Sequence, residues 1–175
     1  MNPQILIEPI INGQSHGVAV QAKVFQFGLK ITNRSNNPSE AFTISRIVMG
    51  SAHGQNISDD FGRKTFAVGI INPDQSTVID VGNNGQFMFG LINITATIVP
   101  SDVSRPITFF QKNPFTGSYY EIGVNNWLDF FYIRSSSEDL QEKTNKWLVI
   151  LTWVIAVSAL ITTLPILIPL VFPKS

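Results

Sequence analysis

Histidine is the side chain that most often supplies acid–base chemistry near neutral pH, and this sequence contains two, His16 and His53. Each is followed by a glycine, a context that is typical of a loop. Ser15 beside His16 pairs a hydroxyl nucleophile with a base, but such a pair also needs an acid that orients the histidine. The sequence indicates no such acid, so we predict no catalytic residues.

The sequence also contains no pattern that indicates a metal site or a cofactor site. Asp59 and Asp60 are adjacent carboxylates, but they lack the alternating oxygen ligands of a calcium loop and are typical of a solvated turn. The segment Gly82 to Gly85 is glycine-rich, yet no Lys-Ser or Lys-Thr follows it, as a phosphate-binding loop would require. We therefore predict no metal site, no cofactor and no enzymatic activity.

The segment from Trp127 to Tyr132 differs from these in carrying large apolar side chains at nearly every position. In a strand, alternate residues point to opposite faces, so Trp127, Asp129 and Phe131 share one face. Both faces then need cover from the core, a packed loop, another protein or lipid headgroups. Because Asp129 is tolerated more easily at an interface rim than in a core, we predict that Trp127 and Phe131 bind a partner. The other face, expected in the core, carries Leu128, Phe130 and Tyr132.

The overall composition excludes several classes of function. The chain has 12 basic and 12 acidic residues, so it offers no basic field for nucleic acid, and we predict no nucleic-acid partner. There is no cysteine, which excludes disulfides and thiolate metal sites. The 13 phenylalanines and the low charged fraction of 14% favour strands over solvated helices.

The strongest single signal is the run from Trp147 to Phe172, which contains no charged side chain. A bilayer core of about 30 Å needs roughly 20 apolar helical residues, and this run is longer. Pro165 and Pro169 would bend its last third. We predict one membrane-spanning helix over residues 147–172 with a short tail at 173–175, so the lipid bilayer is an expected partner.

Residues 135–146 are polar, but they are patterned as a helix and not as a flexible linker. Ser135 and Glu138 have the spacing of a capping box, which is typical of a helix N-terminus. We expect one continuous helix from about Ser137 into the span, with residues 135–146 as a stalk. Two pairs at i,i+4 support it, namely Asp139 with Lys143 and Glu142 with Lys146.

The N-terminal sequence and the positions of the basic residues indicate on which side of the membrane the domain lies. The N-terminal residues lack a basic region, a long apolar region and a cleavage site, and so do not resemble a secretory signal. Basic residues near the span are mostly on the domain side, which favours a cytoplasmic domain anchored by a C-terminal helix. The glycosylation sequons that begin at Asn33, Asn56 and Asn93 would instead suit a lumenal surface.

Residues 1–134 are patterned as strands separated by turns. From Lys23 to Asn33 apolar and polar residues alternate with the period of two that a half-buried strand requires. Gly82 to Gly85 is expected to be a hairpin turn. Further strands are expected at residues 42–49, 64–71, 77–81, 86–99, 119–124 and 127–134.

About seven to nine short strands with turns between them predict a mainly β domain, an antiparallel β-sandwich with a β-barrel as the alternative. The alternation of Phe27, Leu29, Ile31 and Asn33 before an Asn/Ser/Pro turn resembles the second strand of immunoglobulin-like accessory domains in prokaryotic membrane or surface proteins. The resemblance implies an immunoglobulin-like sandwich that binds or scaffolds and has no active site of its own.

These features favour a non-catalytic, single-pass, membrane-anchored interaction or scaffold module, such as an accessory subunit or assembly factor of a membrane complex. A protein partner is therefore expected. The alternative is a membrane-anchored sensor whose sandwich or barrel encloses a small ligand. An enzyme comes last, because the sequence advertises no cluster of titratable groups.

Overall fold

The structure is a computed structural model of the chain and describes residues 4–51, 56–57, 64–85, 88–102, 104–105, 107–113, 116–123 and 126–171. Within these ranges there are twelve strands and one helix. The chain divides into two compact units, Met1–Ser135 and Ser136–Ser175. The first contains every described strand, and the second contains the helix.

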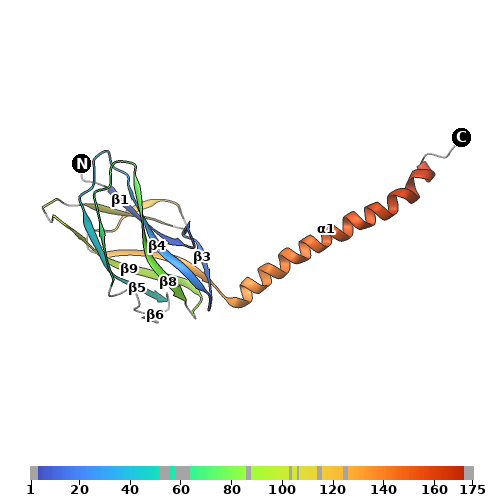
Figure 1. Cartoon of the computed structure of the whole chain (residues 1–175), viewed down its shortest axis with the longest axis horizontal. Helices are drawn as coiled ribbons and strands as arrows, with labels where there is room; N and C mark the ends of the chain where they lie inside the picture. Colours follow the sequence, from blue (N-terminus) through green and yellow to red (C-terminus); the bar gives the residue numbers. More distant parts are fainter. Residues whose placement is uncertain are drawn as a thin grey trace. The chain divides into compact units, whose positions relative to one another are not determined.

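The strands form two six-stranded sheets, as a β-sandwich requires (Figure 1). In sheet A the order is β11-β10-β1-β4-β8, and β2 pairs with β1. Its strands are β1 (Gln4–Ile11), β2 (Gln14–Ser15), β4 (Val24–Asn33), β8 (Ser76–Gly85), β10 (Thr108–Lys112) and β11 (Tyr119–Glu121). In sheet B the order is β3-β12-β9-β5-β6, and β7 pairs with β5. Its strands are β3 (Val18–Val20), β5 (Phe42–Ser51), β6 (Asn56–Ile57), β7 (Thr65–Val68), β9 (Gly90–Pro100) and β12 (Asn126–Arg134).

The predicted mainly β sandwich is confirmed, and the barrel alternative is wrong, because the described strands form two separate sheets. Most pairings are antiparallel, as expected. Two are parallel, β1 with β10 and β3 with β12. Parallel neighbours come from distant parts of the chain and are not joined by a turn, so local sequence patterns cannot indicate them.

Alternation of buried and exposed side chains builds the core between the sheets. In β4 the predicted inward residues Phe27, Leu29 and Ile31 are fully buried. Aromatic rings join the two sheets: the Phe131 ring centroid lies 5.6 Å from that of Phe25, and the Phe42 ring meets Phe109 edge-on at 5.3 Å. Such contacts add about 0.5–1.5 kcal/mol each beyond area burial.

The predicted hairpin at Gly82 to Gly85 is wrong. These residues continue β8 and pair with β4, where Gly82 lies opposite Phe27 and Gly85 opposite Val24. Strands β8 and β9 lie in different sheets, so a tight turn cannot join them. Gly and Asn favour turns locally, but pairing with a complete neighbouring strand outweighs that preference.

At one end of the sandwich, polar side chains hold the segments that cross between the sheets. Asn33, at the end of β4, is fully buried, and its amide nitrogen donates to the backbone oxygens of Asn37 and Ile71 at 2.8 Å each. Its side-chain oxygen accepts from Ser35. The Ser39 hydroxyl accepts from the Ile71 backbone nitrogen at 2.8 Å. The sequon at Asn33 is therefore a structural element, because its amide is buried and occupied.

Helix α1 (Ser136–Val171) begins immediately after Ser135 and continues without interruption, as the sequence predicted. Both expected i,i+4 pairs form, Lys143 with Asp139 at 2.9 Å and Lys146 with Glu142 at 2.7 Å. Its part from Ser136 to Thr162 is long and apolar enough to cross a membrane. The division into a stalk at 135–146, a span at 147–172 and a tail at 173–175 stays a prediction.

Candidate functional site

The two faces of β12 are the reverse of the expected ones. Trp127 is fully buried and Phe131 is 3% exposed, so the residues predicted to bind a partner lie in the core. The Phe131 ring packs against Phe25 and Phe27 of sheet A. The prediction failed because it used Asp129 as a sign of an interface rim, whereas this carboxylate is itself fully buried. Trp127 and Phe131 are thus inaccessible to a partner in this structure.

The buried Asp129 carboxylate has hydrogen-bonding partners on both of its oxygens. One oxygen accepts from the backbone nitrogen of Phe130 at 2.7 Å, and the other lies 3.3 Å from Nε2 of His16. The His16 side chain is 19% exposed, so it closes the site toward solvent. An unpaired charge in the core would be costly, and these contacts are what make Asp129 tolerable there.

His16 also contacts Ser15, which continues the polar network toward the surface. Ser15 Oγ lies 3.3 Å from Nδ1 of His16 and donates to a Glu8 carboxylate oxygen at 3.1 Å. With its hydrogen given to Glu8, the hydroxyl can only accept from Nδ1–H. Nε2, on the other side of the ring, faces the Asp129 carboxylate.

This network lies where the chain passes from sheet A to sheet B. Strand β2 pairs with β1, and β3 pairs with β12, so His16 and Gly17 form the crossing. The His16 backbone nitrogen donates to the Pro9 carbonyl at 2.8 Å. A Cβ on Gly17 would lie 2.5 Å from the Ile11 carbonyl oxygen, so only glycine fits next to His16.

The sequence analysis missed this network because Asp129 lies far from His16 in the chain. One local signal did exist. Asn12 and Gly13 connect β1 to β2 with φ values of 50° and 80°, as expected for a two-residue hairpin of the Asn-Gly type. That dipeptide predicts that Ser15 and His16 fold back along β1. It does not indicate the acid across the sandwich.

Ser15, His16 and Asp129 together have the residue types of a hydrolytic triad, but their hydrogen bonds differ from those that activate a serine. The Ser15 hydrogen is directed to Glu8 and not to the histidine. In a catalytic arrangement the serine donates to the histidine, which accepts its proton. The observed arrangement instead clamps the crossing between the sheets.

Tyr120 on β11 lies opposite the buried Gln111 on β10 and is 42% exposed. Burial raises the pKa of Tyr120 above its ordinary value of 10.0, and the negative charge of Asp129 raises it further. Both effects disfavour the phenolate. Tyr120 therefore remains a neutral phenol beside Asp129 over the physiological range.

The outward face of sheet B carries an exposed row of apolar side chains. Leu128 and Tyr132 of β12 are 39% and 40% exposed, and Phe130 between them is half-buried. Tyr132 lies opposite Val18 on β3 and opposite Leu91 on β9. We call this group the apolar strip, and it comprises Val18, Leu91, Leu128, Phe130 and Tyr132.

The two outward faces differ in charge. Around the apolar strip, the outward side chains of β3, β9 and β12 include one charged residue, Arg134. The outward face of sheet A is charged on every strand from β11 to β8. Its charged residues include Glu8, Lys30, Asp80, Lys112 and Glu121.

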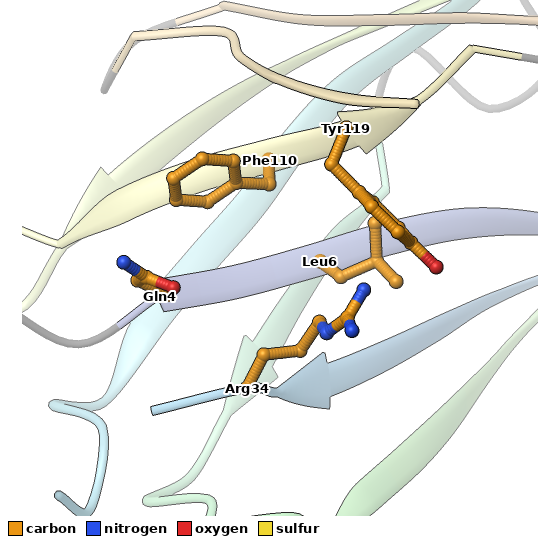
Figure 2. Close-up of a pocket in the computed structure, with 5 residues that line it drawn as sticks. All are labelled: Gln4, Leu6, Arg34, Phe110 and Tyr119. Atoms are coloured by element: carbon orange, nitrogen blue, oxygen red, sulfur yellow. The ribbon is translucent and has the colours of Figure 1, made fainter. Parts of the chain in front are cut away.

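The outward face of sheet A also has a hollow of about 240 Å³ (Figure 2). Leu6 forms its floor, and Arg34 lies beside it with the guanidinium carbon 4.2 Å from the centre of the Tyr119 ring. The residues that line it are Gln4, Leu6, Arg34, Phe110 and Tyr119. We call it the Arg34 pocket.

Within the described residues, no group of three or more His, Asp and Glu side chains is placed to hold a metal ion. His53, Asp59 and Asp60 lie outside the described residues. His16, the other histidine, is occupied by Asp129 and Ser15.

Replacing Trp127 with Ala should lower the free energy of unfolding by about 3–5 kcal/mol, because it leaves a cavity between the sheets. The matched change on the other face, Leu128→Ser, should change it by less than about 1 kcal/mol. Urea unfolding of the detergent-solubilised chain, followed by circular dichroism, measures both. Equal destabilisation by the two variants would contradict the observed faces.

The contact between Asp129 and His16 can be measured by a double-mutant cycle. We expect Asp129→Asn and His16→Phe to show a coupling free energy of about 1–3 kcal/mol in urea unfolding, because each variant leaves the other group without its partner. Ser15→Ala, at the exposed end of the network, should cost about 0.5–1 kcal/mol. Strictly additive single changes would show that the contact contributes nothing.

The raised pKa of Tyr120 predicts that the stability of the fold decreases at alkaline pH. Because the pKa of Tyr120 is raised in the folded state, its contribution to the free energy of unfolding is complete below pH 10.0. That contribution is lost as the pH rises through the higher folded-state pKa. The wild-type chain should therefore lose more stability than Tyr120→Phe between about pH 9 and pH 11. Urea unfolding at the two pH values measures the difference. Parallel losses in both proteins would refute the assignment.

Comparisons with known proteins bear on the fold alone. No family model matches the chain, and no curated protein matches it. A crystal structure of a CARDB domain from Pyrococcus furiosus, solved in complex with di-metal ions, is 14% identical, with 75% of this chain and 89% of that chain covered and a TM-score of 0.41. A solution structure of the same domain is 12% identical. The match covers 76% of this chain and 96% of that chain, with a TM-score of 0.39. A chain of the complex between zinc 2-glycoprotein and prolactin-inducible protein from human seminal plasma is 8% identical, with 75% and 94% covered and a TM-score of 0.41. All three likenesses have TM-scores below 0.5 and identities below 15%.

Proposed function

We propose that this protein is a non-catalytic, membrane-anchored interaction module, an accessory subunit or assembly factor of a membrane complex. In this proposal α1 anchors the chain, and the apolar strip binds a protein partner. The apolar strip is the observation that carries the proposal, because exposed aromatic and aliphatic side chains without charges among them characterise the centre of protein interfaces.

The chemistry of α1 supports an anchor. Several hydroxyl groups in the described part of α1 donate to carbonyl oxygens of the same helix, as Thr152 does to Leu148 and Ser158 to Val154, at 2.8 Å each. Thr162 donates to Ala159 at 2.9 Å. A helix that satisfies its own polar groups in this way can enter hydrocarbon without leaving a donor unpaired.

The position of the apolar strip in the chain supports a membrane protein as the partner. Tyr132 precedes Ser136, where α1 begins, by a few residues, and the uncharged run begins at Trp147. Helical rise and extended-chain length limit the distance from Tyr132 to Trp147 to about 30 Å. A partner embedded in the same bilayer, or bound to its surface, is within that reach.

We place the sandwich on the cytoplasmic side. Arg134, Lys143 and Lys146 lie on the sandwich side of the uncharged run, and Lys174 lies beyond it, which is the distribution of a cytoplasmic domain. The burial of Asn33 removes one of the three sequons that would favour the opposite side.

The interior of the sandwich gives less support to the sensor alternative. Large side chains of both sheets, including Phe27, Phe42, Phe109 and Trp127, are at most 1% exposed and fill the space between the sheets. A ligand enclosed between the sheets would have to displace them at the cost of close packing.

A photo-crosslinker at Leu128, installed in the full-length chain in its native membrane, tests the proposal. We expect a stoichiometric crosslink to a membrane protein, and no such crosslink from a matched position at Val78, which is 60% exposed on the outward face of sheet A. Leu128→Ser combined with Tyr132→Ser should abolish co-purification of that protein, while Val78→Ser should preserve it. Crosslinking only to lipid, or only to a second copy of the chain, would refute a partner protein at the apolar strip.

A further inference from the structure

We propose that the Arg34 pocket binds a small aromatic carboxylate, with Arg34 holding the carboxylate and Leu6, Phe110 and Tyr119 holding the ring. The pocket lies on sheet A, whereas the apolar strip lies on sheet B, so this inference does not depend on the proposed function. It rests on the shape, burial and charge of the hollow.

Strands β1, β10 and β11, together with the residue that follows β4, build the pocket. Leu6 on β1 lies opposite Phe110 on β10, and β11 continues the sheet with Tyr119 opposite Lys112. Arg34 follows directly after β4, and its backbone nitrogen donates to the Gln4 carbonyl at 2.8 Å, which fixes the base of the arginine beside β1. The pocket is therefore supported by paired strands and not by a loop alone.

The floor of the pocket is apolar. Leu6 points outward from sheet A, yet it is only 5% exposed, because the surrounding side chains cover it. Phe110 is half-buried and Tyr119 is 44% exposed, so their rings form walls that a ligand can reach. An aromatic ring between such walls gains both burial and ring stacking.

Arg34 supplies the charge. Its guanidinium carbon lies over the Tyr119 ring, 4.2 Å from the ring centre, and this cation–π contact holds the group beside the hollow. Among the ion pairs of the described residues, none includes Arg34. A guanidinium that has no carboxylate partner among the described residues is suited to bind one through two parallel hydrogen bonds.

The neighbouring charges leave Arg34 dominant. Lys112 lies opposite Tyr119, and Glu121 lies opposite Phe110, but neither lines the pocket. Their opposite signs offset each other at the rim. Gln4 lines the pocket with an amide that can donate or accept. An anionic ligand is therefore favoured over a cationic one.

The size of the hollow limits the ligand. Pockets for drug-sized ligands are commonly about 300–1,000 Å³, and this one is smaller, at about 240 Å³. A single ring with a short carboxylate arm matches that space, so we choose phenylacetate as the probe. Because the pocket is small and partly open, we expect a Kd of about 1 mM or weaker for the probe.

The test is a saturation-transfer NMR titration of the full-length chain in lipid nanodiscs. We expect phenylacetate to bind at least about tenfold more tightly than phenylacetamide, its neutral isostere, because only the acid pairs with the guanidinium. Arg34→Gln should weaken phenylacetate binding about tenfold, and Arg34→Lys should weaken it less, because it keeps the charge and loses the planar fork. Lys30→Gln, on the same outward face outside the pocket, is the matched control and should change Kd by less than about twofold.

Arg34 is exposed, so these variants should fold, which circular dichroism checks. Tyr119→Phe should keep the binding and Tyr119→Ala should weaken it, since the ring and not the hydroxyl supports the guanidinium. Equal binding of the acid and the amide, or unchanged binding by Arg34→Gln, would overturn the proposal and reduce the hollow to an apolar surface feature.

Discussion

The burial of the Asp129 carboxylate is the constraint on which the end of the sandwich around His16 depends. A charge between two sheets requires a partner, and His16 can supply it only if the chain crosses from β2 to β3 beside β12. The crossing in turn requires a glycine at position 17, against the Ile11 carbonyl. With Asp129 directed inward, strand alternation also directs Trp127 and Phe131 inward. The same alternation places Leu128, Phe130 and Tyr132 of the apolar strip on the outward face of β12.

At the opposite end of the sandwich, neutral side chains form hydrogen bonds with the backbone where the chain crosses between the sheets. The crossings after β4 and after β7 meet there, and the buried amide of Asn33 together with Ser39 satisfies backbone groups of both. Arg105, near the start of β10, pairs with Glu40 at 2.7 Å and adds an exposed contact at that end. In both places polar side chains are buried where the chain leaves one sheet for the other, because the backbone there lacks ladder partners. Elsewhere the described core is mostly apolar, although Gln111 on β10 and Asn84 on β8 are also buried.

The two outward faces support different kinds of recognition. Around the apolar strip, sheet B offers a nearly uncharged surface, which we propose binds a protein partner. Sheet A is charged, and its Arg34 pocket combines one stacked guanidinium with an apolar floor, which suits a small anion. A sandwich can carry both because alternation isolates each outward face from the core and from the other face.

The sequence by itself determined the features that depend on local patterns. The period of two in residues 23–33 predicted β4, the charged i,i+4 pairs and the uncharged run predicted α1, and the many short strands predicted a sandwich. It could not determine which face of β12 is buried, because both faces carry large apolar residues and alternation fixes only that they differ. Gly82 to Gly85 became strand through pairing with β4, and the parallel neighbours β1 and β10 are not joined by any turn. The contact between His16 and Asp129 and the assembly of the Arg34 pocket join residues from distant strands. Only the tertiary structure decided them, since the pairing of distant strands depends on how the whole core packs and not on any local pattern.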